Sequence, residues 1–199
     1  MVVGEKLITA EEFFEIVQRP ENEGRRLELV DGVIVEDMAG GASGEHGETV
    51  GNFHGYIWNF VREHRLGRVT AAETCFRLAE DESGRPIVRC PDVGFITFEK
   101  APEPLKSGLV PFAPDLAVEV ISPGNTADEM HMRVLDLLRY GTRMIWIAYP
   151  TTRTVVVHTS AGAHTLEADA LLDGGDVLPG FSMPVSAFFP PAAPPKATA

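Results

Sequence analysis

The sequence is short of cysteine, of positive charge and of long apolar runs. Its 199 residues include only Cys75 and Cys90, without the paired Cys/His spacing of a zinc site, so we expect reduced cysteines inside strands. No apolar segment approaches the length that spans a bilayer, and Met1–Lys6 lacks the apolar core of a signal peptide. These absences predict a cytoplasmic protein that does not enter a membrane.

The scarcity of positive charge bears on nucleic acids as partners. Asp and Glu number 29 against 17 Lys and Arg, which gives a formal net charge of −12. This balance opposes general attraction to a phosphate backbone and argues against tight non-specific DNA binding. It does not exclude a nucleic-acid enzyme, because a local basic rim or a bound divalent cation can reverse the field at one cleft.

The overall composition is that of a folded globular domain. Hydrophobic residues make up 44% of the chain and charged residues 23%. A chain of this length can bury a sizeable core without metals or disulfides. We expect a single domain over residues 1–189, followed by a Pro/Ala-rich tail at 190–199 that is too poor in large apolar groups to order itself.

Capping and turn signals divide the chain into helices and strands. Thr9-Ala-Glu-Glu12 and Thr126-Ala-Asp-Glu129 are capping boxes, and each starts a helix. Asp31-Gly32 lies between two strand patterns and predicts a hairpin. A longer helix is expected over 45–64, with three glycines that recur every four residues and predict close packing on a sheet. These glycines are Gly47, Gly51 and Gly55.

Short β-rich runs alternate with the predicted helices. Beyond the hairpin, strands are expected at 68–72, 74–78, 87–90 running into 93–97, 116–121, 144–149 and 154–158. Strands interrupted by amphipathic helices indicate a mixed sheet with helices packed on it. The sequence therefore predicts an α/β or α+β core.

Glu119 lies within residues 113–122, a run that otherwise has the pattern of a fully buried strand. An unpaired ion in such a place costs several kcal/mol even after relaxation. Glu119 should therefore be protonated, paired with a cation or bound to a metal. Strand geometry alone favours a structural ion pair and a functional carboxylate equally.

Asp92 is the carboxylate best placed to share a metal with Glu119. Asp115 lies on the same strand face, but about 13 Å away at roughly 3.3 Å per residue, too far to hold one ion together with Glu119. Asp92 follows Pro91 at a strand junction and can lie opposite Glu119 on a neighbouring strand. Two carboxylates and a backbone carbonyl near Val120 make a hard-oxygen site that suits Mg²⁺ or Mn²⁺.

Three further residues could take part in chemistry. Arg133 borders the apolar face of the helix after Glu119, so it can be the structural partner of Glu119, which helix geometry favours, or a group that stabilises phosphate charge. His46 opens the long helix, where a lone histidine is more often a capping or core group. Glu28 alternates with leucines, which predicts a solvent-facing hairpin residue.

These segments occur together in the order found in one family. The motifs are Glu28-Leu-Val-Asp-Gly32, His46, Pro91-Asp92-Val93 and Pro114-Asp-Leu-Ala-Val-Glu-Val-Ile-Ser-Pro123. On these motifs the sequence resembles the Uma-type family of putative restriction endonucleases, within the PD-(D/E)XK nuclease superfamily. The resemblance runs from about Leu7 to Phe189 and includes Gly141, Trp146, Pro150 and Leu178–Pro184.

The resemblance implies a restriction-endonuclease-like mixed β-sheet flanked by helices, with an added N-terminal hairpin and C-terminal strands. It implies metal-dependent hydrolysis of DNA phosphodiester bonds, with DNA as substrate. Asp92, Glu119 and the Val120 backbone carbonyl would bind Mg²⁺ or Mn²⁺, and His46 and Glu28 match further positions of the family's site. Nucleases of this fold commonly dimerise to address two strands, so a homodimer is compatible with the resemblance.

The chain departs from the family pattern at its lysine. The superfamily's lysine is Ile121 here, and the lysine that usually replaces it on the next helix is Arg133, which keeps the charge but does not readily lose a proton. The alternative is therefore a catalytically inactive module for protein interaction or nucleic-acid binding, with Arg133 paired to Glu119. A serine hydrolase is disfavoured because Ser43 and Ser122 lack a nucleophile-elbow pattern.

Overall fold

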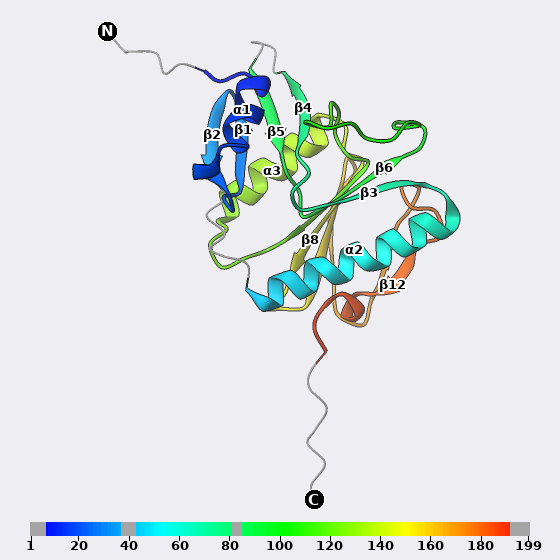
Figure 1. Ribbon diagram of the computed structural model, residues 1–199. Coiled ribbons are helices and arrows are strands. Elements are labelled where there is room, and N and C mark those ends of the chain that lie inside the picture. The colour runs from blue at the N-terminus through cyan, green and yellow to red at the C-terminus, as the bar shows by residue number, and fades with distance from the viewer. Residues whose placement is uncertain (1–6, 37–42, 81–84, 192–199) are drawn as a thin grey trace, which may run out of the picture.

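A six-stranded mixed sheet forms the centre of the molecule (Figure 1). The computed structural model describes residues 7–36, 43–80 and 85–191. The strand order is β10-β9-β8-β7-β6-β3, in which β7 and β8 are parallel and the other neighbours are antiparallel. The strands are β3 (Gly67–Ala71), β6 (Val93–Thr97), β7 (Leu116–Val120), β8 (Met144–Tyr149), β9 (Thr154–Thr159) and β10 (Gly162–Leu166).

Two helices cover opposite faces of this sheet (Figure 1). Helix α2 (Gly44–His64) packs Phe53, Ile57 and Val61 on one face, and α3 (Ala127–Arg139) packs its apolar side on the other. Alternate residues of β7 serve the two layers, since Val118 belongs to the α2 side and Ala117 to the α3 side. Because Glu119 has the parity of Ala117, its side chain lies on the α3 side.

The predicted hairpin is present and belongs to a second sheet. This sheet has the order β2-β1-β5-β4, and α1 (Ala10–Val17) packs on it. Both turn residues have positive φ, 52° at Asp31 and 77° at Gly32, as the primed turns of two-residue hairpins require. The strands are β1 (Leu27–Val30), β2 (Val33–Glu36), β4 (Phe76–Glu80) and β5 (Pro86–Arg89).

The chain passes from one sheet to the other at Cys90-Pro91-Asp92. The predicted strands at 87–90 and 93–97 exist, but β5 pairs in the four-stranded sheet and β6 in the six-stranded sheet. Proline at the joint has no N–H to donate to a ladder, which suits a strand boundary. Asp92 therefore lies where the two sheets meet.

The C-terminal part of the chain completes the core on the α2 side. Phe188 stacks on Phe53 with ring centroids 4.1 Å apart. Of the predicted tail, residues 192–199 lie outside the described part of the chain. Within the described ranges, no helix combines the length and apolar character needed to cross a bilayer. The remaining elements are η1 (Pro20–Asn22), β11 (Leu171–Asp173), β12 (Ser182–Pro184) and η2 (Val185–Phe188).

The expectation of reduced cysteines was wrong, because Cys75 and Cys90 form a disulfide with Cα atoms 4.1 Å apart. The strand register explains the pairing. Phe76 lies opposite Arg89 in the β4–β5 pair, so the next positions outward, Cys75 and Cys90, face each other. Neither cysteine carries a local sign of this bond, because only the pairing of the two strands brings the sulfurs together.

The role predicted for the three α2 glycines was also wrong. A Cβ added at Gly47, Gly51 or Gly55 would meet nothing within 4 Å. They lie on the side of α2 away from Phe53 and Ile57, which pack on the sheet. The four-residue repeat therefore marks an open helix face and not a close approach to the sheet.

Candidate active site

Asp92 and Glu119 face each other at the end of the β6–β7 pair. Val93 pairs with Val118, so continuing the antiparallel register by one residue sets Asp92 opposite Glu119. Directly opposite residues have Cβ atoms about 4.5–5.5 Å apart, and both carboxylates are buried, with 1% and 4% of the residue surface exposed. Sheet pairing thus brings together the two carboxylates that the sequence singled out.

The Asp92 carboxylate takes the place of a strand partner for β7. The Val120 N–H donates to Asp92 Oδ2 at 2.8 Å, because β6 begins at Val93 and offers no backbone acceptor at this position. In a strand, the N–H and C=O of one residue point to the same edge. The Val120 carbonyl therefore faces the same side as Asp92.

The second oxygen of Asp92 is held by cationic and polar side chains. Arg26 Nη2 lies 2.8 Å from Oδ1, and His46 Nε2 lies 3.6 Å from it. The other ring nitrogen of His46 is 3.0 Å from Ser122 Oγ. Burial alone would raise the pKa of Asp92, but His46, Arg26 and the Val120 N–H together hold the pKa of this carboxyl below its usual value.

Arg133 joins Glu119 to Glu28 on the α3 side of the sheet. Its Nη1 lies 3.0 Å from Glu119 Oε1, and its Nη2 lies 3.1 Å from Glu28 Oε2. The predicted contact between Arg133 and Glu119 is therefore present. Glu28 is only 3% exposed, so the expectation of a solvent-facing hairpin residue was wrong. The neighbouring leucines in the sequence give no sign that Glu28 is buried, because its burial comes from contacts with Arg89 of β5 and Arg133 of α3.

A second buried arginine extends this cluster. Arg89 at the end of β5 binds Glu28 Oε2 through Nη1 at 2.8 Å and binds Asp136 of α3 through both Nε and Nη2. The Cys90 N–H donates to Glu28 Oε1 at 2.8 Å. The two arginines and the Cys90 amide occupy both oxygens of Glu28. This cluster ties the second sheet to α3.

The carboxylates of the cluster differ in how well they are neutralised. Burial penalises the charged form of Glu28, yet Arg133, Arg89 and the Cys90 N–H lower its pKa below the ordinary value. Burial raises the pKa of Glu119 to about 8; Arg133 opposes this shift, whereas the nearby charges of Asp92 and Glu28 add to it. Glu119 is therefore the buried carboxylate with an incomplete counter-charge.

The oxygen ligands fit a hard divalent cation such as Mg²⁺ or Mn²⁺. The donor set is two carboxylates and one carbonyl, with no sulfur and no required imidazole. Arg133 hydrogen-bonds Oε1 of Glu119, and no hydrogen bond to Oε2 is found from the described residues. Within the same ranges, no group of three or more His, Cys, Asp or Glu side chains is arranged to hold a metal. A cation here would depend on the Val120 carbonyl and on waters.

Several residues of the site were not predicted from the sequence. These are Arg26, Arg89, Ser122 and Asp136. Arg89 carried a usable signal, since a cation in an apolar strand pattern needs a partner as much as Glu119 does. Ser122, His46 and Asp92 form a chain, but the serine contacts Nδ1 and the carboxylate Nε2, the reverse of a hydrolase triad. The chain instead orients His46 towards Asp92.

Comparisons with known proteins identify the fold and the family. A crystal structure titled as that of "a putative nuclease belonging to DUF820" from Anabaena variabilis ATCC 29413 matches with a TM-score of 0.72 and 23% identity, over 92% of this chain and 97% of the other. At that identity the likeness shows the fold, a mixed sheet flanked by helices. A search of curated proteins found no match. The sequence model of Uma2, described as "Putative restriction endonuclease", matches residues 10–186, and the chain belongs to this family.

Proposed function

We propose that this protein is a metal-dependent endonuclease that hydrolyses DNA phosphodiester bonds. The observation that carries the proposal is the β6–β7 register, which, continued by one residue, sets Asp92 opposite Glu119; both are buried, and the Val120 N–H binds Asp92 beside them. Membership of a family described as restriction endonucleases supports DNA as the substrate. Mg²⁺ or Mn²⁺ bound there would supply an activated water and offset charge on the phosphate.

The surrounding residues position these ligands. The Val120 N–H, Arg26 and His46 fix the Asp92 carboxylate from three directions. Arg133 fixes Glu119 and, because it is also bound to Glu28, it stays close to the sheet. In this arrangement Arg133 adds the positive charge that a lysine supplies in related chains, without the ability to exchange a proton near neutral pH.

A second function is favoured by one contact. Arg133 forms an ion pair with Oε1 of Glu119, an oxygen through which Glu119 could otherwise bind a metal. If this pair is permanent, the protein is a catalytically inactive module of the same fold that binds nucleic acid or another protein. The two functions differ in whether a divalent cation can displace the pair.

Plasmid nicking in Mg²⁺ or Mn²⁺ tests the proposal. We expect Asp92→Asn and Glu119→Gln to lose about 100-fold or more of the wild-type rate, because even outer partners of a metal typically cost 10–100-fold. Asp169→Asn, which removes an exposed carboxylate far from the site in sequence, should leave the rate unchanged. Thermal melting verifies that each variant is folded.

Arg133→Lys separates the two functions. Lysine restores the residue usual in the family, so the rate should be kept or raised if Arg133 is a catalytic substitute. Absence of nicking by both the wild type and Arg133→Lys, together with no Mn²⁺-dependent rise in Tm, would exclude the nuclease and leave the binding module.

A further inference from the structure

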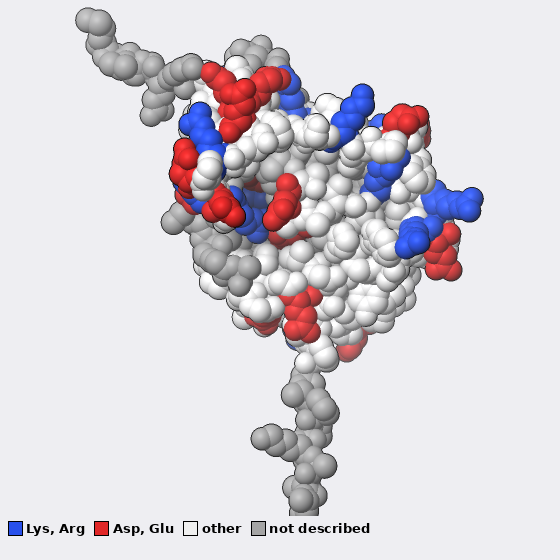
Figure 2. Space-filling model, in the orientation of Figure 1, with Lys and Arg blue, Asp and Glu red and all other residues white. Residues whose placement is uncertain are grey.

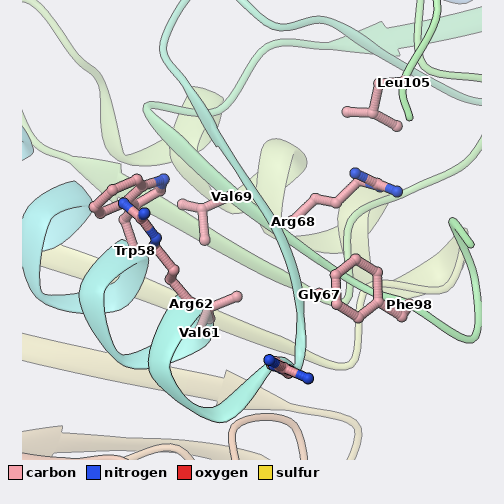
Figure 3. A pocket seen from close by; sticks show the side chains of 9 residues that line it. Trp58, Val61, Arg62, Gly67, Arg68, Val69, Phe98 and Leu105 are labelled. Carbon is pink, nitrogen blue, oxygen red and sulfur yellow. The ribbon is translucent and has the colours of Figure 1, made fainter. Parts of the chain in front are cut away.

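A second concave site lies at the far end of α2 from His46. It is a cavity of about 440 Å³ between the last turns of α2, the start of β3 and the segment after β6 (Figure 3). Three arginines and two large aromatics line it: Arg62, Arg65, Arg68, Trp58 and Phe98. Figure 2 shows Lys and Arg side chains gathered on this part of the surface, with acidic side chains at their edge.

The arginines of this cavity, unlike those of the candidate active site, face no carboxylate. None of the residues that line the cavity is Asp or Glu. Arg68 donates to the carbonyl oxygens of Ala101 at 3.0 Å and Pro102 at 2.9 Å, so its position is fixed while its charge stays uncompensated. In the described part of the chain, Arg62, Arg65 and Arg68 form no ion pair. Such a concentration of positive charge in a protein of net charge −12 needs an explanation.

Each of two arginines lies over an exposed aromatic ring. The Arg62 guanidinium is 4.9 Å from the Trp58 ring centre, and that of Arg68 is 5.2 Å from Phe98 (Figure 3). Both aromatics are 40% exposed. Exposed rings next to cations at a cavity combine the two contacts that unpaired nucleotides use, namely stacking and phosphate binding.

Local structure holds these groups in place. Trp58 and Arg62 are four residues apart and share one side of α2, and Arg65 follows directly as the residue that caps the C-terminus of the helix. The strand that follows approaches its neighbour closely at Gly67, where an added Cβ would collide with the Ile96 carbonyl oxygen. Main-chain pairing continues past the strand ends, since the Phe98 N–H donates to the Leu66 carbonyl at 3.1 Å. The cavity is therefore built on paired strands and a helix, not on an irregular loop alone.

We propose that this cavity binds single-stranded nucleic acid, with the arginines on the phosphates and an unpaired base stacked on Trp58 or Phe98. Guanidinium groups bind phosphate oxygens in pairs, and every base has a flat face to stack, so the site would select strands with little sequence preference. The proposal uses none of the residues at the candidate metal site. It stands or falls independently of nuclease activity.

Fluorescence of the two tryptophans gives a direct test. Trp58 is exposed whereas Trp146 is fully buried, so a strand that stacks in the cavity should quench Trp58 emission. The probe is a twelve-nucleotide oligothymidylate in EDTA at low salt, long enough to span α2, which is about 32 Å at 1.5 Å per residue. We expect saturable quenching that is absent in Trp58→Phe, while a labelled oligomer still binds that variant by anisotropy.

Arginine variants supply the matched comparison. The double variant Arg62→Ala, Arg68→Ala should weaken binding about tenfold or more. It should also make the slope of log affinity against log salt less steep by about 1.4, because each lost phosphate contact with a single strand accounts for roughly 0.7. Arg139→Ala is the control, since Arg139 also lies over an aromatic ring, 5.5 Å from that of Tyr140, but on α3. It should bind like the wild type.

Three results would overturn the proposal. The first is the absence of saturable quenching, and the second is equal affinity of the double arginine variant and the Arg139→Ala control. The third is competition by inorganic phosphate, a mononucleotide or a duplex as strong as that of the single strand. Because the assay contains no divalent cation, none of these results depends on whether Asp92 and Glu119 bind metal.

Discussion

Arginine has opposite surroundings in two regions of this molecule. Arg89 and Arg133 are buried, and each contacts two carboxylates. Arg62 and Arg68 lie over aromatic rings at an open cavity that no Asp or Glu lines. The difference follows from solvation, because a charge removed from water must be neutralised inside the fold, whereas a charge left at the surface is available to a partner. The first pair therefore stabilises the fold, and the second fits recognition.

Removal of a buried arginine should have the largest effect. In Arg89→Met the carboxylates of Glu28 and Asp136 lose a shared cation, so the free energy of unfolding should fall by about 3–5 kcal/mol. Arg62→Met removes an exposed charge and should change it by no more than about 0.5 kcal/mol. Urea unfolding measures both, and similar losses in the two variants would abolish the distinction between the regions.

Loss of the disulfide should have the next largest effect on the free energy of unfolding. It should leave the cavity around Arg62 and Arg68 unchanged. Cys75 and Cys90 are 15 residues apart, and closing a loop of that size stabilises a fold by about 3 kcal/mol. Replacing both with serine should lower the free energy of unfolding by this amount. Trp58 emission in the folded state should stay the same, because the cavity is built on the other sheet. A changed Trp58 spectrum would show that the two regions are coupled.

The smallest expected effect is a pH dependence at Glu119. Its pKa is raised from 4.5 to about 8 in the folded protein, so the protonated form stabilises the fold, and this contribution is lost as the pH rises through about 8. In EDTA, wild-type stability relative to Glu119→Gln should fall by on the order of 1 kcal/mol between pH 7 and 9.

Unfolding curves at several pH values measure this difference. Asp92 and Glu28 have lowered pKa values, so their contribution to stability is lost as the pH falls rather than as it rises. Both residues are present in the wild type and in Glu119→Gln, so their contribution cancels in the difference. A flat difference between the wild type and Glu119→Gln would mean that Arg133 neutralises Glu119 fully. Every buried carboxylate in contact with Arg89 or Arg133 would then be fully neutralised.

The sequence predicted local features and the residues that needed partners. The Asp31-Gly32 hairpin and the capping boxes at Thr9 and Thr126 are encoded within four residues each, and all three are present. Glu119 was recognised because a carboxylate in an apolar strand is costly wherever the strand lies. Asp92 was then identified by excluding the carboxylate on the same strand.

Features that depend on two distant segments were not predicted. The pairing of Cys75 with Cys90 follows from the β4–β5 register, and the burial of Glu28 follows from contact of one sheet with α3. Pro91 marks a boundary between β5 and β6, but nothing local shows that the two strands belong to different sheets, because that depends on which distant strands they pair with. Nothing in the sequence singled out Arg62 or Arg68, since only the fold sets them around one cavity.

The hydrogen bond between the Val120 amide and Asp92 gives the candidate active site a spectroscopic reporter. Most amides of a central strand are held by the backbone of a neighbouring strand, but this one is held by a carboxylate. Its NMR chemical shift therefore follows the ionisation and the ligands of that carboxylate. Its exchange with deuterium likewise follows the opening of this one contact rather than the separation of two strands. A single backbone resonance thus reads the chemical state of the site without any label on a ligand.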